Sequence, residues 1–111
     1  MQIGIDVGAT KIESVVLDEK GNESNRERTE CPKDYLQIIR TIKEINEKLE
    51  KEFKKKLPIG VCHPGIQSPQ TGLVKNAPNC FWLEKKPFQN DLRKAKSKFC
   101  CTWLDDNRKI T

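Results

Sequence analysis

The sequence has no run of apolar residues long enough to cross a membrane, and its mean hydropathy is −0.73. A membrane-spanning helix needs about 20 consecutive, predominantly apolar residues. The N-terminus also lacks the apolar segment and cleavage site of a secretory signal, because a strand-like pattern begins at once. We therefore expect a cytoplasmic protein that does not contact membranes.

Metal-ligand spacing is also missing from the sequence. It has one histidine, His63, and no Cys-x-x-Cys pair, so no metal site is predicted. His63 could act as a base or a ligand, but we favour a local role in its loop. We interpret the cysteines as reduced thiols; the adjacent Cys100 and Cys101 could be redox-active, but we favour two small apolar residues in a strand. The five cysteines are Cys31, Cys62, Cys80, Cys100 and Cys101.

Acidic residues are fewer than basic ones, with 16 aspartates and glutamates against 21 lysines and arginines, which gives a net charge of +5. Between residues 43 and 56, however, lysines alternate with glutamates. This pattern is typical of a solvent-exposed helical face with ion pairs three or four residues apart. A stripe that follows a phosphate backbone would lack the acids, so we do not expect a nucleic-acid partner. The 111 residues suffice for one domain.

The most informative stretch lies near the N-terminus, where a turn separates two apolar, strand-like segments, 2–5 and 12–17. The turn carries Asp6, Gly8 and Thr10 in the pattern Asp-x-Gly-x-Thr. Gly8 allows unusual backbone conformations and brings its N–H close to an anion, Thr10 can donate a hydroxyl to a phosphate oxygen, and Asp6 can hold a hydrated divalent cation. Asp, Gly and Thr are also common in ordinary β-hairpins, so the turn alone leaves both interpretations open.

The next segments predict an α/β sheet. After a turn at 18–22, residues 23–30 suit a polar third strand, and Asp34 can cap a helix over 34–55. A buried strand over 57–62 follows, so strand, helix and strand imply a crossover and parallel pairing. His63, Pro64 and Gly65 end this strand at its carboxyl end, where α/β sheets bind ligands. The expected inner face of the helix is Tyr35, Ile39, Ile42, Ile45, Leu49 and Phe53.

Shorter elements complete the chain. Residues 68–72 predict a turn, and residues 73–76 a short strand. A second helix is predicted over 87–99, with Leu92, Ala95 and Phe99 on its inner face, and a strand over 100–104. Phe81 and Trp82 could stack on a flat ligand face, but we favour their packing onto the sheet.

Two groups of residues resemble the ROK sugar kinases, members of the actin-like and hexokinase-like ATPase superfamily. The segment 3–13, Ile-Gly-Ile-Asp-Val-Gly-Ala-Thr-Lys-Ile-Glu, is similar to the opening of that family, except that Ala9 replaces a glycine. The second group is similar to the family sequence that forms part of the sugar pocket and is spread over about two dozen positions. It comprises Gly60-x-x-x-Pro64-Gly65, Ser68-Pro69-x-Thr71-Gly72-x-Val74, Asn76-Ala77-x-Asn79 and Trp82.

The resemblance implies a fold and a chemistry. The fold would be an N-terminal, ribonuclease-H-like lobe of the α/β class, with a mixed sheet and packed helices. The family's activity would be phosphorylation of a hexose or N-acetylhexosamine by ATP with Mg²⁺. Gly65 and Asn79 would help form the sugar pocket, whereas the family's zinc site has no counterpart here. The residues implied at the phosphates are Asp6, Gly8, Thr10 and Lys11.

The resemblance also implies a catalytic base. In the family, an aspartate in Asn-Asp-Ala-Asn takes the proton from the attacking sugar hydroxyl, and Asp105 is in register with it. The neighbours differ, because Leu104 stands in place of an asparagine and Asp106 in place of an alanine. Asp105 is therefore either the base or part of a polar tail, and we favour the tail. We accordingly expect a kinase lobe over 1–101 and a divergent tail over 102–111.

The family's second lobe has no counterpart in the sequence, which leaves the functional hypotheses open. The first is a truncated kinase lobe that is inactive alone, because phosphoryl transfer needs two substrates positioned between two lobes. The alternative is a non-catalytic sugar-binding or regulatory module that forms a homo-oligomer or pairs with a full-length kinase. A ROK transcriptional repressor is less favoured, since no helix-turn-helix precedes the first strand. The resemblance does not identify the sugar.

Overall fold

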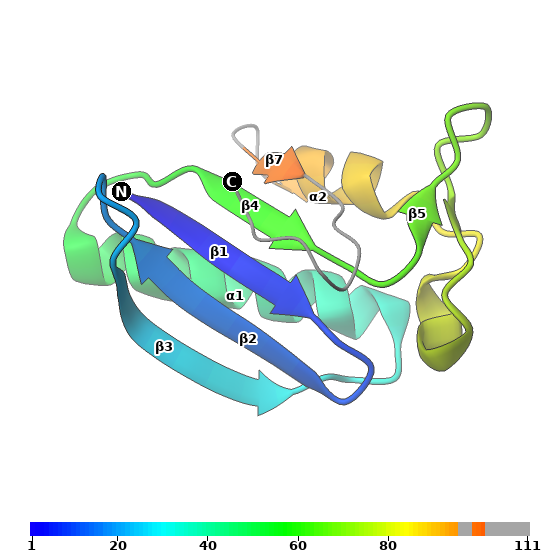
Figure 1. Cartoon of the computed structure of the whole chain (residues 1–111), viewed down its shortest axis with the longest axis horizontal. Coiled ribbons are helices and arrows are strands. Elements are labelled where there is room, and N and C mark those ends of the chain that lie inside the picture. The colour runs from blue at the N-terminus through cyan, green and yellow to red at the C-terminus, as the bar shows by residue number, and fades with distance from the viewer. Residues whose placement is uncertain (96–98, 102–111) are drawn as a thin grey trace.

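The computed structural model describes residues 1–95 and 99–101, and its centre is a five-stranded mixed sheet with the order β3-β2-β1-β4-β7 (Figure 1). Strands β1, β2 and β3 pair antiparallel in succession, whereas β4 runs parallel to β1 and β7 parallel to β4. The strands of this sheet are β1 (Gln2–Val7), β2 (Lys11–Leu17), β3 (Glu23–Glu30), β4 (Ile59–Cys62) and β7 (Phe99–Cys101). The sheet is therefore of the mixed α/β kind that the sequence predicts.

Strand β1 lies at the middle of the sheet, and its alternation explains its place. Ile3 and Ile5 are fully buried and Val7 nearly so, on the face that helix α1 (Tyr35–Phe53) covers, behind the sheet in Figure 1. The register places Val16 of β2 opposite Ile3, and Ile12 opposite Val7. Every residue of β3 is exposed, because β3 is an edge strand with a polar sequence. The three predicted antiparallel strands are confirmed, and β1 extends two residues further to include Asp6.

Helix α1 begins and ends with the expected local signals. The side chain of Asp34 accepts a hydrogen bond of 3.1 Å from Gln37 N, which confirms the predicted N-cap. At the other end Lys54 takes the left-handed conformation with φ 57°, and its N–H donates to Glu50 O. The buried residues of the helix itself are Ile38, Ile42, Asn46 and Leu49.

This buried stripe corrects part of the predicted inner face of α1. Ile38 was not predicted but is fully buried, whereas Ile39 and Ile45 are only partly buried. The sheet contacts a stripe that runs from Ile38 through Ile42 to Leu49, and Ile39 and Ile45 lie beside it. Tyr35 and Phe53 also lie at this margin, packed against the core but partly exposed.

Helix α2 (Phe88–Ala95) is shorter than the sequence predicts. Phe99, expected on its inner face, begins β7 instead and pairs with Ile59. The helical spacing of Phe99 gave no sign that its backbone pairs with another strand. Leu92 is fully buried as predicted, and Tyr35 Oη donates 2.6 Å to Asp91 Oδ2, which joins α1 to α2. Cys100 and Cys101 lie in β7 as expected, while positions 102–104 of the predicted final strand lie outside the described residues.

Three short elements connect β4 to α2. Strands β5 (Ile66–Gln67) and β6 (Val74–Lys75) form a small antiparallel hairpin, and the 3-10 helix η1 (Pro78–Leu83) follows. The sequence predicted β6 but neither β5 nor η1. Among the described residues, no helix is long and apolar enough to span a bilayer.

Candidate functional site

The carboxyl ends of β1 and β4 lie side by side, because these strands are parallel and Asp6 pairs with Cys62. The β1–β2 turn and the loop after β4 therefore begin at the same edge of the sheet. Asp6 itself is exposed there. The structure thus brings the two segments that the sequence singled out to one place.

The β1–β2 turn is a tight hairpin closed by backbone contacts. Gly8 N–H donates 2.8 Å to Lys11 O. A Cβ on residue 8 would lie 3.0 Å from that same oxygen, so close approach, and not an unusual φ, favours glycine here. The Gly8 N–H therefore closes the hairpin here, and the predicted contact of Gly8 with a nucleotide phosphate stays a prediction.

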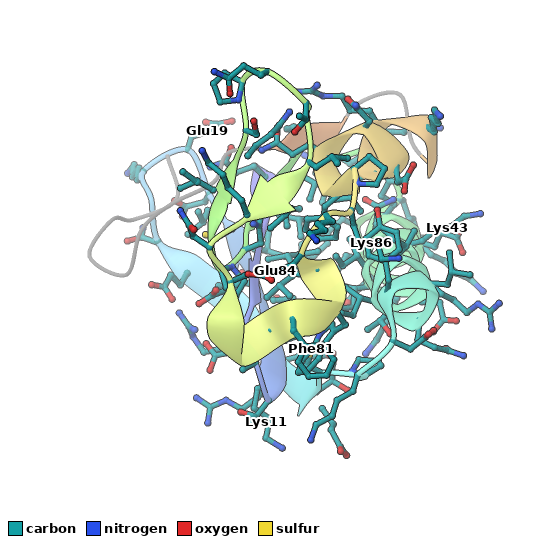
Figure 2. The ribbon with its side chains drawn as sticks, turned by 90° about the vertical axis from the view of Figure 1, so that its right-hand side faces the viewer. Lys11, Glu19, Lys43, Phe81, Glu84 and Lys86 are labelled. Carbon is teal, nitrogen blue, oxygen red and sulfur yellow. The ribbon has the colours of Figure 1, made fainter. Side chains whose placement is uncertain are left out.

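The other turn residues present polar groups to solvent. Thr10 and Lys11 are exposed, and Figure 2 shows the Lys11 side chain extending away from the sheet. Together with Asp6 they supply a hydroxyl, an ammonium and a carboxylate within one hairpin. Hydroxyl and ammonium groups bind phosphate oxygens, and a carboxylate suits a hydrated Mg²⁺. The turn is therefore a hairpin in its backbone, and phosphate binding by its exposed polar groups stays a prediction.

The thiol of Cys62 lies beside Asp6 without adding charge to the site. Burial and, to a smaller extent, the nearby Asp6 carboxylate together raise the pKa of Cys62 to about 12. The thiol consequently stays protonated at neutral pH. Within the described part of the chain, no three Cys, His, Asp or Glu residues converge as a metal site.

His63 holds the loop that follows β4. Its Nδ1 lies 2.8 Å from Pro64 O, so this nitrogen carries the proton and donates to the carbonyl. The ring is 2% exposed and meets the Phe88 ring edge-on, with centroids 5.3 Å apart. Burial lowers the pKa of His63, although the bond to Pro64 opposes this shift. A neutral, buried imidazole agrees with the local loop role and not with an exposed base.

Gly65 is fixed by its contact with β6. Its φ is +78°, and a Cβ at this position would lie 2.4 Å from Lys75 O and 3.1 Å from Ala77 Cβ. No other residue fits without moving one of these backbones. The loop after β4 is therefore anchored to the β5–β6 hairpin.

Aromatic side chains of η1 divide between core and surface. Trp82 is 9% exposed and packs in the core as predicted, whereas the packing predicted for Phe81 is wrong, since its side chain is 68% exposed. Their rings meet edge-on with centroids 5.0 Å apart. Figure 2 shows Phe81 and Glu84 on this segment. Glu84 Oε1 accepts 2.9 Å from Ala77 N–H and so joins the two ends of η1, a contact that the sequence did not indicate.

Cys31 connects the turn to η1. Its N–H donates 2.8 Å to Thr10 O. Burial raises the pKa of its thiol, while the Trp82 side chain opposes the shift. Burial, with a smaller electrostatic contribution from Cys31, raises the pKa of Cys80 to about 12. Sequence reasoning missed this connection, because nothing in the spacing of Thr10, Cys31 and Cys80 relates them.

The sequence pattern of the ROK family matches residues 2–107. This chain belongs to the ROK family. Among curated relatives, an N-acetyl-D-glucosamine kinase of Mannheimia succiniciproducens is 36% identical over 93 residues, which are 83% of this chain and 30% of that protein. The N-acetyl-D-glucosamine kinase of Haemophilus influenzae is 33% identical with the same coverage. The ROK chain thus spans about 30% of the length of the curated relatives it matches.

Solved structures of ROK proteins share the fold. A ROK hexokinase from Thermus thermophilus matches 92% of this chain and 34% of its own with a TM-score of 0.75 at 23% identity. A ROK family glucokinase from Streptomyces griseus, solved with glucose and AMPPNP, matches 95% and 33% with a TM-score of 0.75 at 22% identity. At these identities the likeness shows the fold alone. The predicted fold class, an actin- and hexokinase-like lobe with a mixed sheet and packed helices, is confirmed.

The remaining predicted site residues of this ROK chain are only partly placed. Asn79 belongs to η1, but its side chain lies outside the described part of the structure. Asp105 also lies outside the described residues. The structure therefore gathers Asp6, Thr10 and Lys11 on one hairpin, next to the strand end from which Gly65 follows, and leaves the roles of Asn79 and Asp105 as predictions.

Proposed function

We propose that this chain is a lobe of an ATP-dependent sugar kinase that phosphorylates a hexose or an N-acetylhexosamine. One observation carries the proposal: the parallel register of β1 and β4 places the Asp6 hairpin beside the loop of His63, Pro64 and Gly65. The curated relatives are named N-acetyl-D-glucosamine kinases, and the Streptomyces griseus glucokinase was solved with glucose and AMPPNP. These names support a sugar and ATP as substrates, and we place the activity in the cytoplasm, where ATP is available.

The hairpin would bind the terminal phosphates of the nucleotide. Thr10 donates its hydroxyl to a phosphate oxygen, and the Lys11 ammonium offsets the negative charge of the phosphates. Asp6 fits Mg²⁺, which is commonly held by one or two carboxylates together with waters and substrate phosphates. When bound, the ion neutralises charge on the phosphoryl group.

The sugar would lie on the β4 side of the hairpin. Gly65 holds the loop close to β6, and Asn79 of η1 would bind a sugar hydroxyl. Asp105, if it is the base, accepts the proton of the attacking hydroxyl. We propose that the chain alone does not transfer phosphate, because the reaction requires both substrates to be held between two lobes.

Calorimetric titration of the purified chain with Mg·AMPPNP tests the phosphate site. We expect measurable binding that T10V weakens by about tenfold or more, because one hydrogen bond to a charged group is worth about 1.5 to 3 kcal/mol. T41V is a matched control, since Thr41 Oγ1 donates to Gln37 O on the exposed part of α1. Equal affinity of T10V and T41V for the nucleotide would contradict the proposed site. Sugar-dependent release of ADP by the chain would contradict its inactivity alone.

A non-catalytic role is the second candidate. A ROK family transcriptional regulator shares the fold with a TM-score of 0.70 at 11% identity, so this fold also occurs in a protein described as a regulator. In that case the chain would bind a sugar, as a homo-oligomer or together with a full-length kinase. Glucose or N-acetylglucosamine would then raise the melting temperature while Mg·AMPPNP would not. Sedimentation velocity with and without the sugar would report the oligomeric state.

A further inference from the structure

We propose that Arg26 and Arg28 are positioning residues that act on the phosphate-binding hairpin through Glu13. Their guanidinium groups neutralise a carboxylate that would otherwise lie beside Asp6 and repel a polyphosphate. This inference rests on the proposed function, because it assumes that the hairpin binds nucleotide phosphates.

Strand register places Glu13 next to Asp6. The two residues are direct partners across the antiparallel β1–β2 pair, so both side chains leave the sheet on the same face. Cβ atoms of such partners lie roughly 5 Å apart. Like charges directly opposite each other are unfavourable, and a bound nucleotide would bring more negative charge to the same place.

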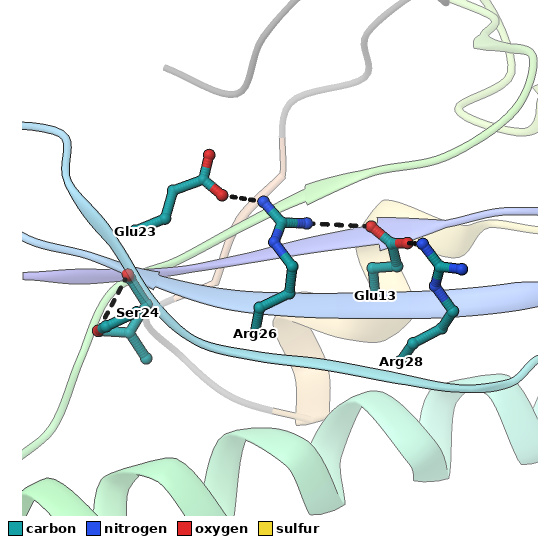
Figure 3. A network of polar contacts seen from close by, with 6 residues as sticks. Glu13, Glu23, Ser24, Arg26 and Arg28 are labelled. Atoms are coloured by element: carbon teal, nitrogen blue, oxygen red, sulfur yellow. Dashed lines mark hydrogen bonds and ion pairs between the residues drawn. The ribbon is translucent and has the colours of Figure 1, made fainter.

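Two arginines of the edge strand β3 bind the Glu13 carboxylate. Arg28 is the cross-strand partner of Glu13 and contacts its Oε1, and Arg26 Nη1 lies 3.1 Å from Oε2 (Figure 3). Arg26 also contacts Glu23, which holds its guanidinium between the two acids. Both oxygens of Glu13 are therefore paired, and its side chain is 26% exposed.

The irregularity in β3 helps to place Arg26. The β2–β3 register shifts between Ser14 and Val16, and Asn25 takes φ +52° in the facing part of β3. Such a bulge redirects the side chains around it. Arg26 and Arg28, two positions apart in β3, lie on the same face and reach the same carboxylate.

A purely structural explanation is that the ion pairs hold the edge strand in place. The arginine side chains are 53% and 66% exposed, and ion pairs this exposed contribute little to stability. Their effect on a charged ligand is a separate quantity. It should be moderate and should decrease with salt, because exposed charges are screened.

Mg·AMPPNP binding to the natural chain and to three variants separates these explanations. The variants are R26Q/R28Q, E13Q and the combined E13Q/R26Q/R28Q. We expect R26Q/R28Q to weaken binding about three- to tenfold at low salt when Glu13 is present. In the E13Q background the same two substitutions should change affinity less than twofold, because the carboxylate they neutralise is gone.

Each outcome decides the proposal. An equal loss in both backgrounds would mean that the arginines act directly on the nucleotide, which would overturn it. Unchanged binding by R26Q/R28Q would also overturn it while leaving the proposed function intact, whereas no binding by the natural chain would reject both. R26K/R28K, which keeps the charges, should restore most of the affinity. Melting temperatures of all variants, measured without ligand, show whether each chain is folded.

Discussion

Replacing Gly65 with alanine tests whether backbone contact fixes the loop after β4. The new Cβ would lie 2.4 Å from Lys75 O and would force an L-residue to φ +78°. The left-handed conformation costs about 1 to 2 kcal/mol, and crowding in a packed region adds about 1 to 3 kcal/mol. We therefore expect G65A to lower the free energy of unfolding by about 3 kcal/mol or more, a large share of the stability of a small domain.

Urea unfolding followed by tryptophan fluorescence measures this loss, and two other glycines provide matched controls. Gly72 has φ +74° but meets nothing closer than 3.6 Å, and Gly21 has φ +82° with nothing within 4 Å. G72A and G21A should therefore cost only the conformational part, about 1 to 2 kcal/mol. If G65A were no more destabilising than G72A, the close approach of the loop to β6 would be refuted.

Three further substitutions test other contacts of the fold. E50A removes the carboxylate that accepts 2.9 Å from Leu57 N–H at the end of α1, so the free energy of unfolding in urea should fall by about 1 to 3 kcal/mol. Y35F removes the 2.6 Å bond to Asp91 between the two helices and should cost about 1 to 2 kcal/mol by the same measurement. His63 has a lowered pKa in the folded chain, so the unfolded chain binds its proton first and stability should fall as the pH drops below about 6.5.

Controls for these predictions use residues of similar chemistry. E52A removes a carboxylate on α1 that accepts a hydrogen bond from the exposed Asn25 side chain, and it should cost less than E50A. Y35F without a stability change would mean that the 2.6 Å bond does not help to hold α1 against α2. For His63, the decisive comparison is H63Q, in which the loss of stability between pH 7 and pH 5 should be smaller. An identical pH dependence in both chains would assign the effect to other groups.

Local patterns predicted most of the sheet and the start of α1. The alternation of Ile3, Ile5 and Val7 reflects a period of two that any sheet with one covered face imposes. Asp34 was recognisable as an N-cap because its side-chain bond to Gln37 spans three residues. Such features depend on neighbours in the chain, so they can be predicted from sequence.

Elements that depend on distant partners were predicted less well. Phe99 fits a helical spacing, but its backbone pairs with Ile59, and the pairing decides its structure. A hydrogen bond between Glu84 and Ala77 joins the two ends of the 3-10 helix η1, and no short-range sequence pattern predicts it. Strand pairing therefore outweighed local preference at Phe99, whereas η1 depends on a side-chain bond across seven residues that its sequence did not indicate.

The candidate site shows the same division. The motif gave Asp6, Thr10 and Lys11 as candidate ligands, and the structure places Thr10 and Lys11 on an exposed hairpin. The motif could not show that Gly8 N–H closes that hairpin, because the acceptor is the backbone carbonyl of Lys11, which is the same for every residue type. The opposition of Asp6 and Glu13 likewise follows from register and not from the motif.

The bond from Cys31 N–H to Thr10 O also gives the hairpin a natural reporter. An amide proton exchanges with solvent only when its hydrogen bond opens, so the exchange rate of Cys31 measures how often the hairpin separates from the end of β3. A ligand that fixes the hairpin would slow this exchange although it never touches Cys31. Deuterium uptake at a buried cysteine could then follow occupancy of the phosphate site without any label on the ligand.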